Sequence, residues 1–188
     1  MNELEVMLDF NKAILTGCRL TTRKLSDMAD YYSDQSAVRK VLDAKQDPAL
    51  YDIYECAGAE EPGNMTFGTT IIHPGKIGNE YYMSKGHFHA VDSAEVYLGL
   101  TGKGLLLLQN RNGDFTSTEL EKGTVVHIAP GWAHRSVNTG KEEFSYFFVY
   151  FSNAGHDYES VKRTGLKKLA LEKDSGSVLV DNPNYKEK

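Results

Sequence analysis

Apolar and polar residues alternate along most of this chain, in short segments separated by turns that contain glycine. Alternation with a period of two is typical of strands that bury one face. From residue 49 onward these segments are rich in β-branched and aromatic residues, which predicts strands over 49–57, 64–73, 79–89, 94–102, 104–110, 114–121, 123–129, 133–140 and 143–152. Many short strands at this spacing indicate an antiparallel barrel or sandwich, so we expect an all-β fold.

Two hairpins are expected within this pattern. Asn112 and Gly113 lie between two predicted strands, and an Asn-Gly pair in that position is a strong short-range hairpin signal. A second hairpin is expected across residues 174–177, where KLALEK meets SVLVD. The aromatic run YFFVYF at 146–151 is compatible with core packing and equally with a buried partner interface.

A helical pattern precedes the strands. Residues 33–46 place Ala37, Val38, Val41 and Leu42 on one stripe, with Ser33 as the expected N-cap and Pro48 beyond the end. A shorter capped turn is expected at 26–32. No repeat or linker divides the chain, so we expect a single domain over 1–188. Its parts are an N-terminal arm and helix over 1–49, a barrel core over about 50–153 and a C-terminal extension over 154–188.

The composition of the chain limits the kinds of molecule that it is expected to bind. The net charge of −5 argues against nucleic acid, because duplex binding needs a basic stripe. Short basic segments at 21–24 and 161–168 are expected to be solvated surface. No run approaches the roughly 20 apolar residues of a membrane helix, and acids stand where a secretory signal needs a basic start. We therefore expect a cytoplasmic protein without a membrane partner.

The two cysteines lie far apart in the sequence. Cys18 and Cys56 fit no CxxC spacing, which is the common pattern of metal and redox sites. Free cysteine behaves as a small apolar side chain that is usually buried. We expect two reduced, buried thiols.

A group of histidines and one carboxylate carries the candidate chemistry. In a strand, residues two apart point to the same face, so His87 and His89 project together, as do Glu95 and Tyr97 on the next strand. His134 lies on a later strand. If these strands are neighbours in a barrel, three imidazoles and one carboxylate meet inside. Such ligands suit Fe(II), Mn, Ni or Zn and leave positions open for substrate.

The spacing of these residues resembles the two motifs of the cupin superfamily. The first is GHFHx5Ex6G over 86–102 and the second is Gx7Gx2Hx3N over 123–138. Five residues separate His89 from Glu95 where most cupins have three or four, and Ala129 stands where proline is common. The resemblance implies a cupin fold, a double-stranded β-helix or jelly-roll barrel with a short N-terminal helix and peripheral strands. It also implies that the metal ligands are His87, His89, Glu95 and His134.

Four longer segments resemble one cupin family, the cupin-type phosphoglucose isomerases of archaea and some bacteria. They are TTIIHPGKIGNEYYMSKGHFHA, AEVYLGLTGKGLLLLQ, GTVVHIAPGWAHRSVN and NAGHDY, and the similarity extends from residues 23–28 through 180–183. The resemblance implies a homodimeric enzyme of glycolysis and gluconeogenesis that interconverts glucose 6-phosphate and fructose 6-phosphate. One divalent ion per subunit is expected, Fe(II) first and Mn(II), Ni(II) or Zn(II) as alternatives.

The same resemblance assigns the substrate contacts. The phosphate-binding positions are Tyr51, Thr70, Ser84, Gly86 and Tyr158, and the residues at the sugar end are Tyr97 and His156. Ser84 stands where the family usually has threonine and keeps the hydroxyl. Hydroxyls and a glycine amide can bind a phosphate dianion without a P-loop. We expect Thr70 and Ser84 on adjacent strands, and His156 and Tyr158 on a loop.

Two histidines, His73 and His127, match no ligand position and are expected to be structural.

Glu95 is the expected general base. One carboxylate can take the C2 proton and return it at C1 through a cis-enediolate, and a direct hydride shift remains the alternative. Tyr97 is expected to relay protons at O1 or O2, and His156 to assist ring opening at O5. The metal would stabilise negative charge on the sugar oxygens.

Two other classes of cupin protein could carry the same set of metal ligands. One is another cupin enzyme, such as a different sugar-phosphate isomerase or epimerase or an Fe(II) dioxygenase, because one fold hosts many chemistries. The other is a non-catalytic sugar-binding cupin. The phosphate set of Thr70, Ser84 and Gly86 favours the isomerase, since a dioxygenase has no need of it.

Overall fold

The structure, a computed structural model, describes residues 5–174 and 176–186. Its strands are β1 (Met7–Asp9), β2 (Ile14–Thr16), β3 (Arg19–Lys24), β4 (Ala49–Cys56), β5 (Met65–Ile72), β6 (Lys76–Ile77), β7 (Glu80–Tyr81), β8 (Phe88–His89), β9 (Glu95–Thr101), β10 (Lys103–Asn110), β11 (Phe115–Glu121), β12 (Val125–Ile128), β13 (Trp132–Val137), β14 (Phe144–Phe151), β15 (His156–Asp157), β16 (Lys168–Lys173) and β17 (Gly176–Asp181). Its helices are α1 (Leu25–Met28), the 3₁₀ helix η1 (Ala29–Tyr31), α2 (Gln35–Asp43) and α3 (Tyr158–Thr164).

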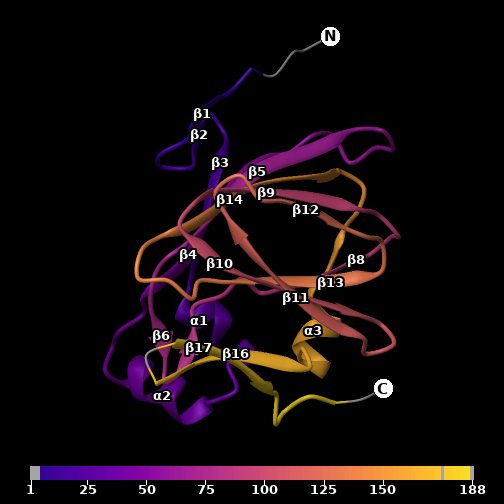
Figure 1. Cartoon of the computed structure of the whole chain (residues 1–188). Coiled ribbons are helices and arrows are strands. Elements are labelled where there is room, and N and C mark those ends of the chain that lie inside the picture. The colour runs from indigo at the N-terminus through magenta and orange to yellow at the C-terminus, as the bar shows by residue number, and fades with distance from the viewer. Residues whose placement is uncertain (1–4, 175, 187–188) are drawn as a thin grey trace.

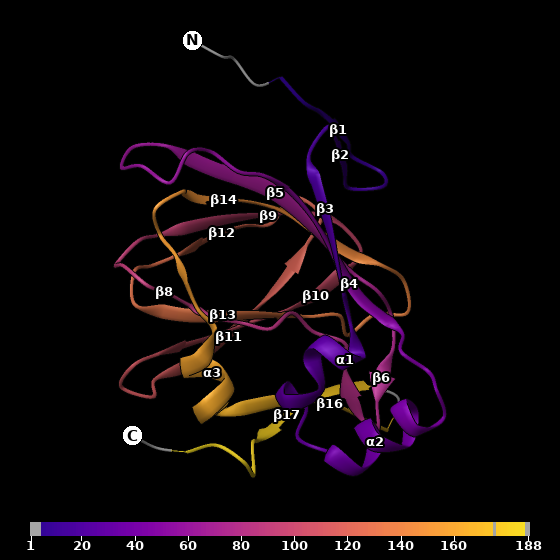
Figure 2. The ribbon, with the colours of Figure 1, turned by 180° about the vertical axis from the view of Figure 1, so that it is seen from behind.

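Two antiparallel sheets face each other across the core (Figure 1). One has six strands in the order β12-β9-β14-β5-β4-β3, and the other has three in the order β11-β10-β13. A four-stranded sheet, β17-β16-β7-β6, lies below them beside α1 and α2, as Figure 2 shows from behind. The predicted all-β fold with a short N-terminal helix and peripheral strands is confirmed.

The aromatic run on β14 packs into the core. Tyr146, Phe148 and Tyr150 are buried, whereas Phe147 and Phe151 on the other face are more exposed. This alternation follows from the pleat, which points successive side chains to opposite faces. Burying an aromatic side chain contributes about 2–3 kcal/mol, so β14, which lies between β5 and β9, is central to the stability of the larger sheet.

The hairpin at Asn112 and Gly113 is confirmed. β10 and β11 pair in register from Lys103 opposite Glu121 to Gln109 opposite Phe115. Gly113 has a φ of 85°, a backbone conformation that side chains other than glycine rarely adopt. The second predicted turn, 174–177, includes residue 175, which lies outside the described residues. The strands that flank it, β16 and β17, pair as expected.

The helix predicted over 33–46 is confirmed as α2, but its predicted cap is wrong. Asp34 is the N-cap, and its carboxylate accepts hydrogen bonds from the amides of Ser36 and Ala37 at 3.0 and 2.9 Å. The amide and hydroxyl of Ser33 instead donate to Glu80 at 2.9 and 2.8 Å. The turn expected at 26–32 corresponds to α1 and η1. Within the described residues, no helix is both long and apolar enough to cross a membrane.

The prediction of two reduced thiols is wrong, because Cys18 and Cys56 form a disulfide in the structure. β3 pairs with β4 so that Arg19 lies opposite Glu55. This register brings the cysteines beside each other, with their Cα atoms 4.9 Å apart. The sequence RLTTRK of β3 lacks apolar alternation, so neither the strand nor its pairing was predictable.

Candidate functional site

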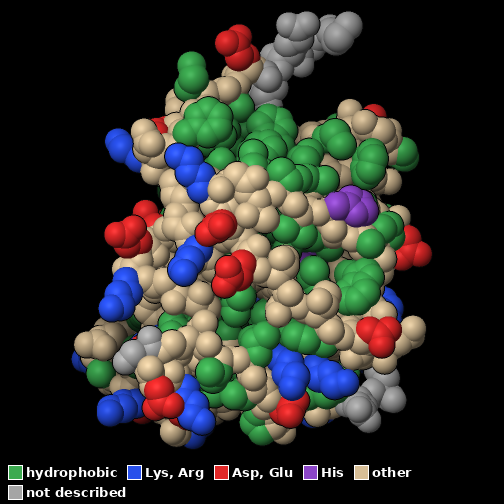
Figure 3. Space-filling model, in the orientation of Figure 1, with side chains coloured by type: hydrophobic (Ala, Val, Ile, Leu, Met, Phe, Trp, Pro, Cys, Tyr) green, Lys and Arg blue, Asp and Glu red, His purple; other side chains and the backbone are tan. Residues whose placement is uncertain are grey.

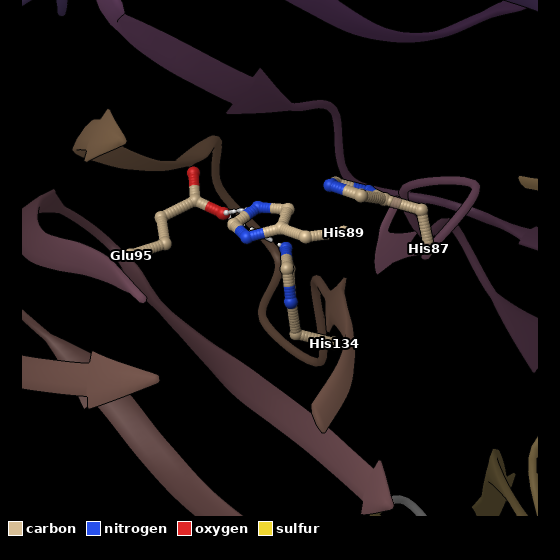
Figure 4. A group of neighbouring side chains, drawn as sticks. All are labelled: His87, His89, Glu95 and His134. Atoms are coloured by element: carbon tan, nitrogen blue, oxygen red, sulfur yellow. Dashed lines mark ion pairs between the residues drawn. The ribbon is translucent and has the colours of Figure 1, made fainter. Parts of the chain in front are cut away.

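The structure brings the four predicted metal ligands to one point between the two sheets. His87 bridges to His134 of β13, His89 ends β8, and Glu95 begins β9. Each residue offers a ligand atom, and these atoms all lie within 4.8 Å of one another. Figure 4 shows the side chains pointing toward a common centre. Because alternate side chains leave a strand on the same face, the four side chains converge as a metal site requires.

The ligand atoms form a buried polar cluster without ordinary hydrogen bonds. Glu95 Oε2 lies 2.9 Å from His134 Nε2 and 3.3 Å from His89 Nε2. None of these three atoms, nor His87 Nε2, has a hydrogen-bond partner among the described residues. Unpartnered buried polar atoms are costly and uncommon. Three imidazole nitrogens and one carboxylate oxygen that meet in this way fit a divalent metal ion.

Backbone carbonyls orient two of the imidazoles. His89 Nδ1 donates to the carbonyl of Ser93 at 2.8 Å, and His134 Nδ1 donates to that of Trp132 at 3.3 Å. These bonds place a proton on Nδ1 and leave the Nε2 lone pair free for a metal. Ser93 belongs to the five-residue spacer between His89 and Glu95, so the longer spacer of this chain supplies the group that fixes His89.

The pKa shifts of His87 and Glu95 favour the forms of these two side chains that bind metal. Burial, together with the charge of His134, lowers the pKa of His87 well below its ordinary value, so this imidazole is neutral. Burial alone would raise the pKa of Glu95, but the imidazoles of His134 and His89 outweigh it and lower the pKa of the carboxyl. A neutral imidazole and an ionised carboxylate are the forms that bind metal.

The cluster lies at one side of an inner cavity of about 70 Å³. A groove of about 320 Å³ shares five lining residues with this cavity and forms its mouth. The residues that the sequence assigned to substrate all line the inner cavity: Tyr51, Thr70, Ser84, Gly86, Tyr97, His156 and Tyr158. A pocket of about 430 Å³ between η1, α3 and residues 182–186 contains none of them. The smaller cavity is therefore the candidate site.

The polar wall of the cavity is built by two segments that are not adjacent strands. Thr70 lies on β5, whose neighbours are β14 and β4, whereas Ser84 lies outside any strand. The expectation of adjacent strands is wrong, because the segment of Ser84 pairs with β13. Ser84 N donates to the Ser136 carbonyl at 2.9 Å, and Ser84 Oγ accepts from Ser136 N at 3.0 Å.

His156 and Tyr158 are not on a loop, so that expectation is also wrong. His156 pairs with His89 in the short β15–β8 ladder, and Tyr158 is the first residue of α3. Asp157 caps this helix and accepts from Ser160 N at 3.0 Å. The ring of Tyr158 stacks on that of His156 with centroids 5.5 Å apart. The short strand and the cap fix both side chains at the cavity mouth.

Several residues that line the cavity were not predicted from the sequence. Tyr150 lies opposite Glu95 in the β14–β9 register, and its hydroxyl donates to Glu55 Oε2 at 3.3 Å. Lys85 and Tyr146 also line the wall. The run at 146–151 signalled that Tyr146 and Tyr150 share a face, but the register that places that face toward Glu95 is not visible in sequence.

The two remaining histidines lie outside the cavity lining. His73 Nε2 lies 3.1 Å from Asp52 Oδ2 and its Nδ1 lies 3.2 Å from Glu143 Oε1, which is a structural bridge. His127 is exposed on β12.

The fold and the four-residue cluster define a cupin. Oxalate oxidase superposes with a TM-score of 0.50 at 18% identity, over 62% of this chain and 58% of that one, so its likeness concerns the fold alone. A family model described as Glucose-6-phosphate isomerase (GPI) matches residues 22–187. This chain belongs to the glucose-6-phosphate isomerase family, which confirms the resemblance seen in its sequence and the prediction of an isomerase.

Curated relatives agree with that family. The glucose-6-phosphate isomerase of Pyrococcus furiosus is 42% identical over 182 residues, which covers 96% of each chain. The glucose-6-phosphate isomerase of Thermococcus kodakarensis is 42% identical over 181 residues, which covers 96% of this chain and 95% of that protein.

Proposed function

We propose that this protein interconverts glucose 6-phosphate and fructose 6-phosphate and holds one divalent metal ion at His87, His89, Glu95 and His134. The observation that carries the proposal is a single cavity, lined by three residues of this four-residue cluster and by hydroxyl and amide donors at Thr70, Ser84 and Gly86. The names of the curated relatives support the same substrates. The proposal places the protein in the cytoplasm, in glycolysis or gluconeogenesis.

The phosphate of the substrate is proposed to bind at the wall of the cavity that carries Thr70, Ser84 and Gly86. A phosphate dianion accepts several hydrogen bonds, and hydroxyls or backbone amides that converge on one place supply them. Thr70 and Ser84 offer hydroxyls, and Gly86 offers its amide. Tyr51 and Tyr158 complete the wall. Burial raises the pKa of Tyr158 to about 12, so its phenol stays a hydrogen-bond donor at neutral pH.

Glu95 is proposed to move the proton. In the open-chain aldose, its carboxylate takes the proton from C2 to give a cis-enediolate and then returns a proton to C1. The oxygen at C2 loses its proton to become the ketone, and the oxygen at C1 gains one to become the hydroxyl. Figure 4 shows one oxygen of Glu95 facing the imidazoles and the other pointing away from them. One oxygen can therefore be a ligand while the other acts as the base.

Two further side chains are proposed to handle the protons on oxygen. Tyr97 lies on β9 two residues after Glu95, so both side chains leave the strand on the same face and reach the cavity. It is proposed to relay a proton between O1 and O2. His156, at the cavity mouth, is proposed to assist ring opening at O5. A direct hydride shift between C2 and C1 is the alternative route, and it requires no base.

Fe(II) is the proposed ion, with Mn(II), Ni(II) and Zn(II) as alternatives, because imidazole and carboxylate ligands suit all four. When bound, it would act as a Lewis acid and stabilise negative charge on the sugar oxygens.

A homodimer is proposed as the active assembly. Figure 3 shows hydrophobic side chains gathered at the end of the molecule where β1, β2 and β5 lie. Large apolar residues are exposed on β1, just after it and at the start of β5, namely Met7 at 72%, Phe10 at 66% and Met65 at 49%. Exposed apolar patches mark interaction sites in soluble proteins. Light scattering after gel filtration should give twice the chain mass of 21.0 kDa.

The proposed reaction can be tested directly with purified protein. Fructose 6-phosphate is supplied, and formation of glucose 6-phosphate is followed by the NADPH that glucose-6-phosphate dehydrogenase then produces. Turnover that is lost in His134→Ala supports the proposal. A wild-type protein that binds metal but forms no glucose 6-phosphate contradicts it. Oxygen consumption without isomerisation would point instead to a cupin oxidase or dioxygenase.

A further inference from the structure

The segment that carries Ser84 and Gly86 is bulged. It pairs with β13 through two isolated bridges, Met83 with Val137 and His87 with His134. Three residues, 84–86, lie between the bridges on one side, and two, 135–136, lie between them on the other. An extra residue on one strand is the mark of a β-bulge, and the φ of Gly86, 69°, suits the glycine position of such a bulge.

The side chain of Arg135 binds the backbone carbonyl of Lys85, which lies in the bulge, outside the β-ladder. Arg135 Nε and Nη2 donate to the Lys85 carbonyl at 3.2 and 2.7 Å. A Cβ added to Gly86 would lie only 3.0 Å from Arg135 Cβ, so the bulge packs closely against the arginine. One planar guanidinium that donates twice to one oxygen fixes both the position and the direction of that carbonyl.

Arg135 is itself buried and supported. It is 3% exposed, and its guanidinium carbon lies 5.8 Å from the ring centroid of Tyr31. Burial lowers the pKa of Arg135, and the nearby carboxylate of Glu80 opposes this shift and favours the charged form. Glu80 is buried too and is held by Ser33. The arginine therefore has a defined place and does not sample the surface as most arginines do.

The direction of the Lys85 carbonyl decides where the next amide points. The Lys85 carbonyl and the Gly86 N–H belong to one peptide unit, and no peptide bond in the described residues is cis. In a trans unit these two bonds point in opposite directions. Arg135 fixes the carbonyl on one side, so the N–H points to the other, where Gly86 lines the inner cavity. No group among the described residues accepts this N–H.

We infer that Arg135 is a positioning residue for phosphate recognition: by holding the Lys85 carbonyl it aims the Gly86 amide at the phosphate of the substrate. The identity of this ligand rests on the proposed function. Arg135 alternates with His134 and Ser136 on β13, so its side chain leaves the strand on the face opposite the metal ligand. Its loss should therefore weaken phosphate binding and leave the metal cluster intact.

The test compares Arg135→Met and Arg135→Lys with wild type and with Arg39→Met, a control at an exposed position on α2. Calorimetry gives the Kd of metal-loaded protein for inorganic phosphate, and kinetics give KM and kcat for fructose 6-phosphate. Arg135→Met should raise both the Kd and the KM about tenfold, with kcat and metal content within about twofold of wild type. Arg135→Lys should recover part of the loss, because lysine donates as a single point charge. Arg39→Met should match wild type.

Two further measurements cover the case in which Arg135→Met does not fold. The double variant Arg135→Met with Glu80→Gln removes both buried charges together, so no unpaired charge is left in the core. In wild-type protein loaded with diamagnetic Zn(II), the amide proton of Gly86 should shift downfield in NMR spectra when inorganic phosphate is added.

The outcomes separate this inference from the proposed function. Unchanged phosphate Kd and KM in a folded Arg135 variant would overturn the inference, as would a Gly86 resonance that does not move when phosphate binds. A wild-type protein that fails to bind inorganic phosphate would overturn it too. A wild-type protein that binds phosphate but does not turn over fructose 6-phosphate would overturn the proposed function alone, and the phosphate Kd would still test Arg135.

Discussion

Glu95 Oε2 lies 2.9 Å from His134 Nε2, although the two residues are on different sheets and 39 positions apart in the sequence. In the proposed function, this approach makes one carboxylate oxygen a metal ligand and leaves the second oxygen for proton transfer. Glu95→Gln keeps the size and one ligand oxygen but removes the base. We expect kcat to fall at least about 100-fold, the usual range for loss of a general base.

The measurement pairs kcat with metal content, so that loss of the base is distinguished from loss of the ion. Glu119→Gln, at an exposed carboxylate on β11, is the matched control and should behave as wild type. Near-normal turnover of Glu95→Gln with metal bound would remove the base role and favour the hydride shift.

Ser84 should act through its hydroxyl. Ser84→Ala removes a donor to phosphate and leaves Ser136 N without the acceptor that it has at 3.0 Å. We expect KM for fructose 6-phosphate to rise about tenfold, equivalent to about 1.4 kcal/mol, with kcat little changed. Ser84→Thr keeps the hydroxyl and should leave KM within about twofold. Equal KM values for the alanine and threonine variants would exclude the hydroxyl from phosphate binding.

Asp157 should couple the stability of α3 to pH. Hydrogen bonds from Ser160 lower the pKa of this carboxyl below its ordinary value of 3.8, because they favour the ionised form. The folded state therefore binds its proton less readily than the unfolded state. The stabilisation is present above pH 3.8 and is lost as pH falls through the lowered pKa of the folded state.

Asp157→Ala should cost about 1 kcal/mol of unfolding free energy at pH 7, the usual effect of losing an N-cap. Asp157→Asn keeps a capping side chain, should cost less and should lack the acid-dependent part. Urea unfolding at pH 7 and near pH 3 measures both. A difference between wild type and the asparagine variant that stays constant over this range would contradict the role of the carboxylate.

The disulfide between Cys18 and Cys56 predicts the thiol content. Unfolded protein prepared without reductant should show no free thiols with Ellman's reagent, and two per chain after reduction. Because the bond joins the residue just before β3 to the end of β4 across a 38-residue separation, reduction should lower stability by about 2–4 kcal/mol. Two free thiols in unreduced protein would restore the prediction made from sequence.

Local pattern predicted most of the fold, and motif spacing predicted which four residues cluster between the sheets. The period of two placed His87 with His89 and Glu95 with Tyr97, because pleat alternation depends only on neighbours along one strand. It missed β3, whose polar side chains show no alternation. No sequence pattern singled out Arg135, since its burial depends on Glu80 and Lys85, about 50 residues earlier in the sequence. Register between strands and the shape of a bulge arise from such long-range pairing.

Metal at this cluster is proposed to enable isomerisation of a hexose phosphate. The most direct measurement is the coupled fructose 6-phosphate assay on protein stripped with a chelator and then reloaded with Fe(II), Mn(II), Ni(II) or Zn(II). Stripping should abolish turnover and lower Tm, since an ion at 1,000 times its Kd adds about 4 kcal/mol of stability. At least one ion should restore both. Full turnover in protein shown to be free of metal, or no turnover with any ion bound, would contradict this role of the metal.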